Sequence, residues 1–323
     1  MKPMKLVVAI GGAVMALSLL TSNAQAQTWP TKSIRIVVSF PPGAPGDIIA
    51  RLIQPDLQKA LGQTIVVDNK PGAGGNIGAQ EVARSSDGHT FLVGPDTMLS
   101  INPHLYKKLS FKPTEDLVPV TLLASFNQML VCHPLTDIRT VADLIAKSKA
   151  GSMNYASGGP GAPGHMAMEM FLSATGVRMN HIPYKGPAPA AQDVLAGQVP
   201  CGFLAAPVVG PHVKDNRLNA LGASGSKRSP GSPNVPTMAE AGVTGFDASF
   251  FEILAAPKGT PSEVMERLQK AVAAAINQPE TRAKLMAADL DPVANTSPQA
   301  QQRIRSDALR WGKVADQIGL QLD

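Results

Sequence analysis

Three loops rich in glycine and proline hold most of the residues that could do chemistry. They span residues 41–47, 157–165 and 184–188, and each follows a strand-like run and precedes a helical period. In an open α/β sheet, ligands collect at such strand ends. The amino end of a helix also offers unpaired N–H groups and a partial positive charge, which attract a small anion. The loops therefore predict a site for a small anion, with a plain tight turn as the alternative.

Four side chains in or beside these loops are candidates for ligand contacts, namely Asp47, Thr97, Ser157 and Tyr184. Thr97 follows the third expected strand, and a structural role as a turn hydroxyl is equally open for it. Asp47 is expected to act as a helix cap that holds the first loop, rather than as a general base. Lys185 either attracts an anion or is a solvated surface lysine, and the second role is favoured.

The second loop also matches a dinucleotide-binding pattern in part. Residues 159–164 follow G-x-G-x-x-G between an expected strand and an expected helix. A dinucleotide site needs an acidic residue about twenty positions further on. No Asp or Glu lies between Met170 and Gln192. We therefore reject dinucleotide binding.

Other catalytic and metal-binding motifs are incomplete. Residues 222–226 lack the closing glycine of G-x-S-x-G, and the chain has no P-loop, H-E-x-x-H or C-x-x-C pattern. His165 and Glu169 share a helix face, but two ligands do not complete a metal site, so a local hydrogen bond is favoured. We expect no metal and no cofactor. One enzymatic alternative stays open, a hydrolase that uses Ser157 with His165 and a third group to orient the imidazole ring.

Strand-like runs alternate with helical periods along the chain, which is typical of parallel strands with crossover helices. Gly62 is expected to end the first helix. The alternation predicts an α/β protein with two lobes. The expected strands cover residues 33–40, 64–67, 90–93, 129–132, 153–156, 181–184, 202–205, 218–223 and 250–255. The expected helices cover residues 47–62, 77–84, 141–148, 165–175, 188–196, 261–277 and 298–318.

The first 26 residues have the composition of a cleaved export signal. Lys2 and Lys5 precede an apolar run over residues 6–20, and Ala24-Gln25-Ala26 supplies a cleavage pattern. The run is short for a membrane span, so we expect export to the periplasm, with the mature chain starting near Gln27. Without the two lysines, 27 basic residues face 24 acidic ones. The net charge of +3 is too small and too scattered for nucleic-acid binding.

Two cysteines, Cys132 and Cys201, lie in apolar strand-like runs. An oxidising compartment permits a disulfide between them. Two buried free thiols are the favoured interpretation, and the pairing stays open.

The loops occur within motifs that resemble a known family. Residues 40–51 resemble the F-P-P-G-G-x-x-D-x-x-A-R signature of the Bug/TctC family, the extracytoplasmic solute-binding receptors of tripartite tricarboxylate transporters. Further motifs follow in the family's order and span essentially all of the mature chain. They lie at residues 69–78, 101–106, 155–165, 183–190, 235–242 and 256–261.

The resemblance implies a two-lobed periplasmic binding protein of the Venus-flytrap type, each lobe built on a mostly parallel sheet. By analogy, lobe 1 comprises residues 27–126 and 254–323, and lobe 2 comprises residues 127–253. The implied function is not enzymatic: a small carboxylate or related solute is captured between the lobes and delivered to a membrane permease. There are two alternatives. One is an exported hydrolase that uses Ser157 and His165, and the other is a receptor that feeds a sensor or regulator.

The sequence departs from the family pattern at the loops. Ala44 replaces a glycine, and Ala162 stands where serine is common. Proline at 160 and 163 removes backbone N–H groups. We therefore expect a ligand less densely charged than a tricarboxylate, such as a monocarboxylate or an aromatic acid. The predicted ligand-binding residues are Pro42, Gly43, Ala44, Asp47, Thr97, Ser157, Gly158, Gly159, Gly161, Ala162, His165, Tyr184, Lys185 and Phe250.

Overall fold

The computed structural model describes residues 28–322. The predicted export signal lies outside the described residues. The chain divides into two units, residues 1–31 and residues 32–323, and the second unit carries the fold described below. Among residues 28–322, no helix has both the length and the apolar character needed to span a bilayer.

The first of two sheets has six strands in the order β11-β4-β10-β3-β1-β2. Strand β1 is parallel to both β2 and β3, whereas β10 is antiparallel to β3 and β4, and β11 is antiparallel to β4. The strands are β1 (Ile34–Val38), β2 (Ile65–Asn69), β3 (Thr90–Pro95), β4 (Leu117–Phe126), β10 (Phe250–Pro257) and β11 (Leu290–Pro292).

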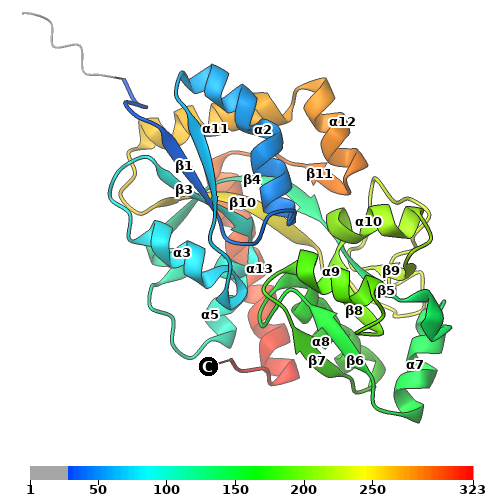
Figure 1. Cartoon of the computed structure of the whole chain (residues 1–323). Coiled ribbons are helices and arrows are strands. Elements are labelled where there is room, and N and C mark those ends of the chain that lie inside the picture. The colour runs from blue at the N-terminus through cyan, green and yellow to red at the C-terminus, as the bar shows by residue number, and fades with distance from the viewer. Residues whose placement is uncertain (1–27, 323) are drawn as a thin grey trace, which may run out of the picture. The chain divides into compact units, whose positions relative to one another are not determined.

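Helices cover both faces of this sheet (Figure 1). Ile53 and Leu57 of α2 pack on one face beside α11, because apolar residues at helical spacing form one stripe. Val82 of α3 and Ile304 of α13 pack on the other face. The helices are α2 (Pro45–Leu61), α3 (Asn76–Ala83), α4 (Thr97–Ser100), α5 (Asn102–Leu105), α6 (Pro113–Asp116), α11 (Ser262–Ile276), α12 (Pro279–Ala287) and α13 (Ser297–Ile318).

The second sheet has five strands in the order β7-β6-β8-β5-β9. Strand β6 is parallel to β7 and β8, and β5 is antiparallel to β8 and β9. The strands are β5 (Gln128–Cys132), β6 (Asn154–Ser157), β7 (Asn180–Pro183), β8 (Cys201–Ala205) and β9 (Asn219–Ala223). The associated helices are α7 (Val141–Ala150), α8 (Pro163–Thr175), α9 (Pro187–Leu195) and α10 (Ala206–Lys214).

The two sheets confirm the predicted two-lobed α/β fold, and Gly62 ends α2 in the left-handed conformation, with φ 70°. The expectation of mostly parallel sheets is wrong, because both sheets are mixed. Strands that pass directly from one sheet to the other arrive without a crossover helix, so they pair antiparallel to their neighbours. The expected elements also did not include β4, β11, the short helices α4, α5 and α6, or helices α10 and α12.

The two sheets are joined by chain crossings. Only Asn127 separates the end of β4 from the start of β5, and its side-chain amide donates to Lys227 O and to Ser229 Oγ. The chain returns to the first sheet at Phe250, the first residue of β10. We refer below to the parts built on the six-stranded and five-stranded sheets as the first and second lobes. The boundaries at 126/127 and 253/254 stay a prediction.

The interpretation of the two cysteines as free thiols is wrong. Cys132 and Cys201 form a disulfide, with a Cα–Cα distance of 4.0 Å. They are directly opposite each other in the antiparallel pair β5–β8, so the sheet register brings together two residues 69 positions apart.

Candidate functional site

A small cavity lies where the predicted loops of the two lobes meet. Its volume is about 20 Å³, close to the space that one water-sized group needs. Residues of both lobes line it, and most are apolar or glycine. The lining residues are Phe40, Pro45, Pro95, Phe126, Gln128, Gly158, Ala162, Pro163, Gly164, Pro187, Ala205 and Glu252.

Four helix amino ends contribute to this lining, those of α2, α8, α9 and α10. The residues that precede them are Ala44, Ala162, Gly186 and Ala205, and none supplies a side-chain cap. Alanine is among the poorest residues at this position, because it cannot accept a hydrogen bond from the first N–H groups of the helix. The first N–H of α10 already donates to Asn127 O at 2.9 Å. The ends of α2, α8 and α9 therefore favour an acceptor group that enters from outside the chain.

A larger chamber of about 180 Å³ neighbours the small cavity and shares Phe40 and Gly158 with it. Tyr184 and the exposed Lys185 line it, together with the glycine loop that precedes α3. The other residues of its lining are Ala73, Gly72, Gly74, Gly159, Pro160 and Pro183.

Asp47 holds the first loop in place. Its Oδ2 accepts from Gly43 N at 3.0 Å, and its Oδ1 accepts from Arg51 Nε at 2.9 Å and from Asn69 Nδ2 at 3.0 Å. Burial opposes ionisation of this carboxyl, but the three hydrogen bonds outweigh that effect and lower its pKa. Both oxygens are engaged, so Asp47 holds the first loop as expected. The expectation that it caps the helix is wrong, because Asp47 lies inside the first turn of α2, and Ala44 precedes the helix without a side-chain cap.

Ser157 is fully buried and lies beside a different histidine from the one expected. Ser157 Oγ is 2.6 Å from His181 Nε2 and accepts from Gly159 N at 3.1 Å. His165 Nδ1 instead accepts from Gly161 N at 3.1 Å, and the His165 ring stacks on His181 at 4.2 Å. The Ser157–His165 pair that the hydrolase alternative needs is not formed.

The two stacked imidazoles are held neutral. Burial and the neighbouring His181 lower the pKa of His165 to about 3, and burial lowers the pKa of His181 to about 4. Burial raises the pKa of Glu169, 3.6 Å from His165 Nε2, against the hydrogen bond from Tyr155 Oη. The neutral, buried pair of rings contacts the second loop through the hydrogen bond that Gly161 N donates to His165 Nδ1.

The two lobes contact each other around the cavities. Tyr106 Oη of the first lobe donates to Pro160 O of the second at 3.0 Å. Phe40, Ala44 and Ala162 form a buried apolar cluster across the cleft. A Cβ at Gly186 would lie 2.5 Å from Pro41 Cδ, so the backbones approach here more closely than a side chain would allow.

The predicted site residues fall into two groups. Those in contact with the small cavity or the chamber are Gly158, Gly159, Ala162, Tyr184 and Lys185. Those outside both linings are Pro42, Gly43, Ala44, Asp47, Thr97, Ser157, Gly161, His165 and Phe250.

Two of the outlying candidates are fully buried. Thr97 has a hydroxyl without a hydrogen-bond partner among the described residues. Phe250 packs between Phe126 and Trp311, at ring distances of 6.3 and 5.5 Å. That packing explains why Phe250 does not form a wall of either space.

Two polar residues of the small cavity were missed by the sequence analysis. Gln128 and Glu252 are both 2% exposed and belong to the strands next to the lobe crossing. Burial, with a contribution from Asp96, raises the pKa of the Glu252 carboxyl well above its usual range. Both residues lie in apolar runs that are typical of core strands. The one sequence feature that could have indicated a site here is the glutamate within the second apolar run.

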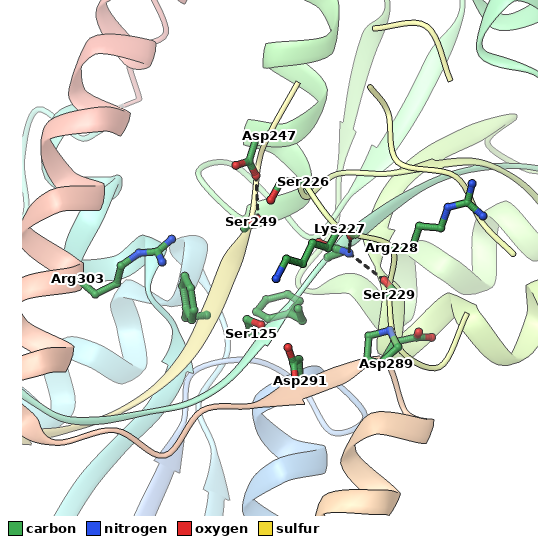
Figure 2. A pocket seen from close by; sticks show the side chains of 14 residues that line it. Ser125, Ser226, Lys227, Arg228, Ser229, Asp247, Ser249, Asp289, Asp291 and Arg303 are labelled. Atoms are coloured by element: carbon green, nitrogen blue, oxygen red, sulfur yellow. Dashed lines mark hydrogen bonds between the residues drawn. The ribbon is translucent and has the colours of Figure 1, made fainter. Parts of the chain in front are cut away.

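A third cavity of about 330 Å³ lies on the other face of the crossing strands (Figure 2). Phe251 lines it, whereas Glu252 lines the small cavity, because successive strand residues point to opposite faces. Figure 2 shows Lys227 reaching toward the crossing strands and Arg228 turned away. Arg303 lies over the Phe251 ring at 4.3 Å and donates to Asp307 Oδ2 at 2.7 Å. None of the predicted loops contributes to this cavity.

No group of three or more His, Cys, Asp or Glu side chains within residues 28–322 is placed to hold a metal ion. The chemistry that the site offers is therefore that of helix ends, backbone amides, aromatic and proline walls, and one buried carboxyl.

Comparison with known proteins finds matches over most of the chain. Residues 49–320 match the model of the tripartite tricarboxylate transporter family receptor. The chain is 34% identical to the protein BugT of Bordetella pertussis, over 97% of this chain and 98% of that protein.

Two solved structures with bound ligands have the same fold. One is the R. palustris protein Rpa4515 with adipate, at a TM-score of 0.87 and 32% identity, covering 91% of this chain and 99% of that chain. The other is MatC from Rhodopseudomonas palustris with bound malate, at a TM-score of 0.84 and 29% identity, covering 88% and 99%.

Proposed function

We propose, from the premise that the chain belongs to the tripartite tricarboxylate transporter family of receptors, that it captures a small organic acid between its two lobes. Proteins with the same fold hold adipate and malate, and those are dicarboxylates. The chain then acts as a receptor in the periplasm and delivers its ligand to a membrane permease.

One observation carries the proposal, the convergence of uncapped helix ends on a cavity between the lobes. The amino ends of α2, α8 and α9 line the small cavity without a side-chain cap. A carboxylate there accepts hydrogen bonds from helix N–H groups that have no partner in their own helix. Carboxylate binding at helix ends needs no basic side chain.

Ligand binding favours the form in which the lobes are in contact. The second loop touches the first lobe through the Tyr106–Pro160 hydrogen bond and the Phe40–Ala44–Ala162 cluster. A ligand held by both lobes stabilises only the form that brings them together, so binding shifts the population toward closure. A permease that recognises the closed form would receive only loaded receptor.

The test is a thermal-melt and calorimetric screen of the purified protein against monocarboxylates, dicarboxylates, aromatic acids and amino acids. A ligand at about 1,000 times its Kd stabilises the folded state by about 4 kcal/mol. Ala162→Leu fills the small cavity and should abolish the response. Ala146→Leu, at an exposed position of α7, should leave it unchanged.

Two outcomes contradict the proposal. One is a flat screen across all the acid classes, and the other is an Ala162→Leu variant that binds as tightly as the wild type. Delivery is tested separately, since deletion of the gene should abolish uptake of the identified acid. Amino-terminal sequencing of the exported protein should begin at Gln27.

A further inference from the structure

An apolar groove of about 480 Å³ lies on the first lobe. It shares no lining residue with the small cavity, with the chamber or with the cavity of Figure 2. Its size is that of a small-molecule site, since such sites measure about 300–1,000 Å³ and are mostly apolar. A ligand in the cleft therefore leaves this groove without a role.

One face of helix α13, red in Figure 1, forms a wall of the groove. Positions 301, 304, 305, 308 and 309 of this helix line the groove, and their spacing places them on a single stripe. The other lining residues belong to α4, α5, α6 and the start of β4. All these elements are part of the first lobe, so the groove needs no contact between the lobes.

The groove exposes apolar surface. Its floor consists of the buried side chains of Leu99, Leu117 and Ile304. Leu309 lies on the same stripe of α13 as Ile304 but is 73% exposed. Ala308, the preceding residue, has only a methyl group and therefore leaves room in the groove. An exposed leucine beside an apolar hollow indicates a surface that a ligand can cover.

The polar groups of the groove determine the charge of its ligand. Arg305 and His104 line it, whereas no Asp or Glu among residues 28–322 does. Arg303 and Arg310 of the same helix both pair with Asp307. Within the described part of the chain, the guanidinium of Arg305 has no such partner. Because a guanidinium binds a carboxylate through two parallel hydrogen bonds, the groove complements an acid rather than an amine.

We infer that this groove binds an unbranched aliphatic acid of medium length. The carboxylate of the acid pairs with Arg305, and its chain covers Leu309 and the apolar floor. The inference goes beyond the function of the cleft and does not rest on it. A protein partner fits less well, because a stable protein interface buries about 800 Å² on each side. Among the described residues that line the groove, Leu309 is the one large apolar side chain in the exposed class.

The test is a calorimetric titration of the purified full chain with octanoate, below the concentration at which octanoate forms micelles. The wild type should bind octanoate saturably. It should bind 1-octanol, which has the same chain without the charge, at least tenfold more weakly, and octyltrimethylammonium not at all. Arg305→Gln should remove the difference between octanoate and octanol. Arg282→Gln, which changes an exposed arginine on α12, should keep it.

Two further variants locate the bound acid. Ala308→Phe fills the groove and should abolish octanoate binding. Ala162→Leu fills the small cavity of the cleft and should leave octanoate binding unchanged. Should Ala308→Phe not fold, the comparison of Arg305→Gln with Arg282→Gln decides instead.

Four results would overturn the inference. They are octanol binding as tight as octanoate binding, an unchanged octanoate affinity in Arg305→Gln, loss of binding in Ala162→Leu with binding kept in Ala308→Phe, and no octanoate binding at millimolar concentration. The third result would place the acid in the cleft and support the proposed function. The fourth leaves a different acid in the cleft unaffected, so the two proposals fail separately.

Discussion

Asp47 shows what a single residue contributes to the site. Its carboxylate joins the first loop, helix α2 and strand β2 through hydrogen bonds to Gly43, Arg51 and Asn69. It lines neither cavity, so its effect on binding is indirect. Asp47 positions the first loop. Ala44 of that loop and the adjoining Phe40 pack against Ala162 of the second lobe.

Asp47→Ala should lower the free energy of unfolding by about 1–3 kcal/mol, because Gly43 N, Arg51 and Asn69 lose their shared charged acceptor. Arg51→Ala removes only a half-exposed ion-pair partner and should cost less than about 1 kcal/mol. Urea denaturation of both variants measures the difference. Equal losses in the two variants would contradict the loop-holding role.

The candidate loops were predictable from sequence, whereas their polar partners were not. Glycine and proline at helix starts are local signals, and they located residues 157–165 and 184–188 near the cavities. His181 reaches Ser157 only because β6 and β7 pair in parallel, which brings together residues 24 positions apart. Glu252 lies in an apolar strand, and periodicity cannot distinguish a core strand from the floor of a cleft.

At the scale of elements, the disulfide fixes the strand pair β5–β8 in the second lobe. It closes a loop of 69 residues that includes β6, β7 and the second and third candidate loops. A cross-link of this span restricts the unfolded chain, which stabilises the folded state.

Replacing Cys132 and Cys201 together by alanine should lower the free energy of unfolding by about 2–4 kcal/mol. Denaturation of the wild type with and without a reductant provides the same comparison without mutation. Ligand affinity should change little, since neither cysteine lines a cavity. A double variant as stable as the oxidised wild type would show that the bond does not stabilise the lobe.

The missed strand β4 has a physical explanation. Strand β4 includes Pro119, and proline argues against a central strand when only the sequence is known. The direct crossing at Asn127 also has no turn signal, because the chain continues from β4 into β5 with one residue between them. Tertiary pairing, rather than local propensity, decides these segments.

At the scale of the molecule, closure of the cleft depends on contacts that exist only between lobes. The hydrogen bond from Tyr106 to Pro160 O is one of them. Tyr106→Phe should weaken ligand binding about threefold to tenfold, because it removes one ordinary hydrogen bond from the closed form. The free energy of unfolding should fall by no more than about 0.5 kcal/mol.

Thr175→Val is the matched control, because it removes a hydroxyl bond to Phe171 O within α8, at the end of the helix away from the cleft. It should leave the Kd unchanged. Calorimetry with the ligand found in the screen measures both variants. Equal affinities of Tyr106→Phe and the wild type would mean that this contact forms in the open state as well.

The packing of Trp311 gives the protein an optical property. The chain has two tryptophans, Trp29 and Trp311, and Trp311 is 1% exposed and stacked on Phe250, the first residue of β10 after the lobe crossing. The emission of an indole depends on the groups that pack against it. A Trp29→Phe protein would therefore have one tryptophan, beside the lobe crossing, and its tryptophan fluorescence would follow the movement of the lobes without an added dye.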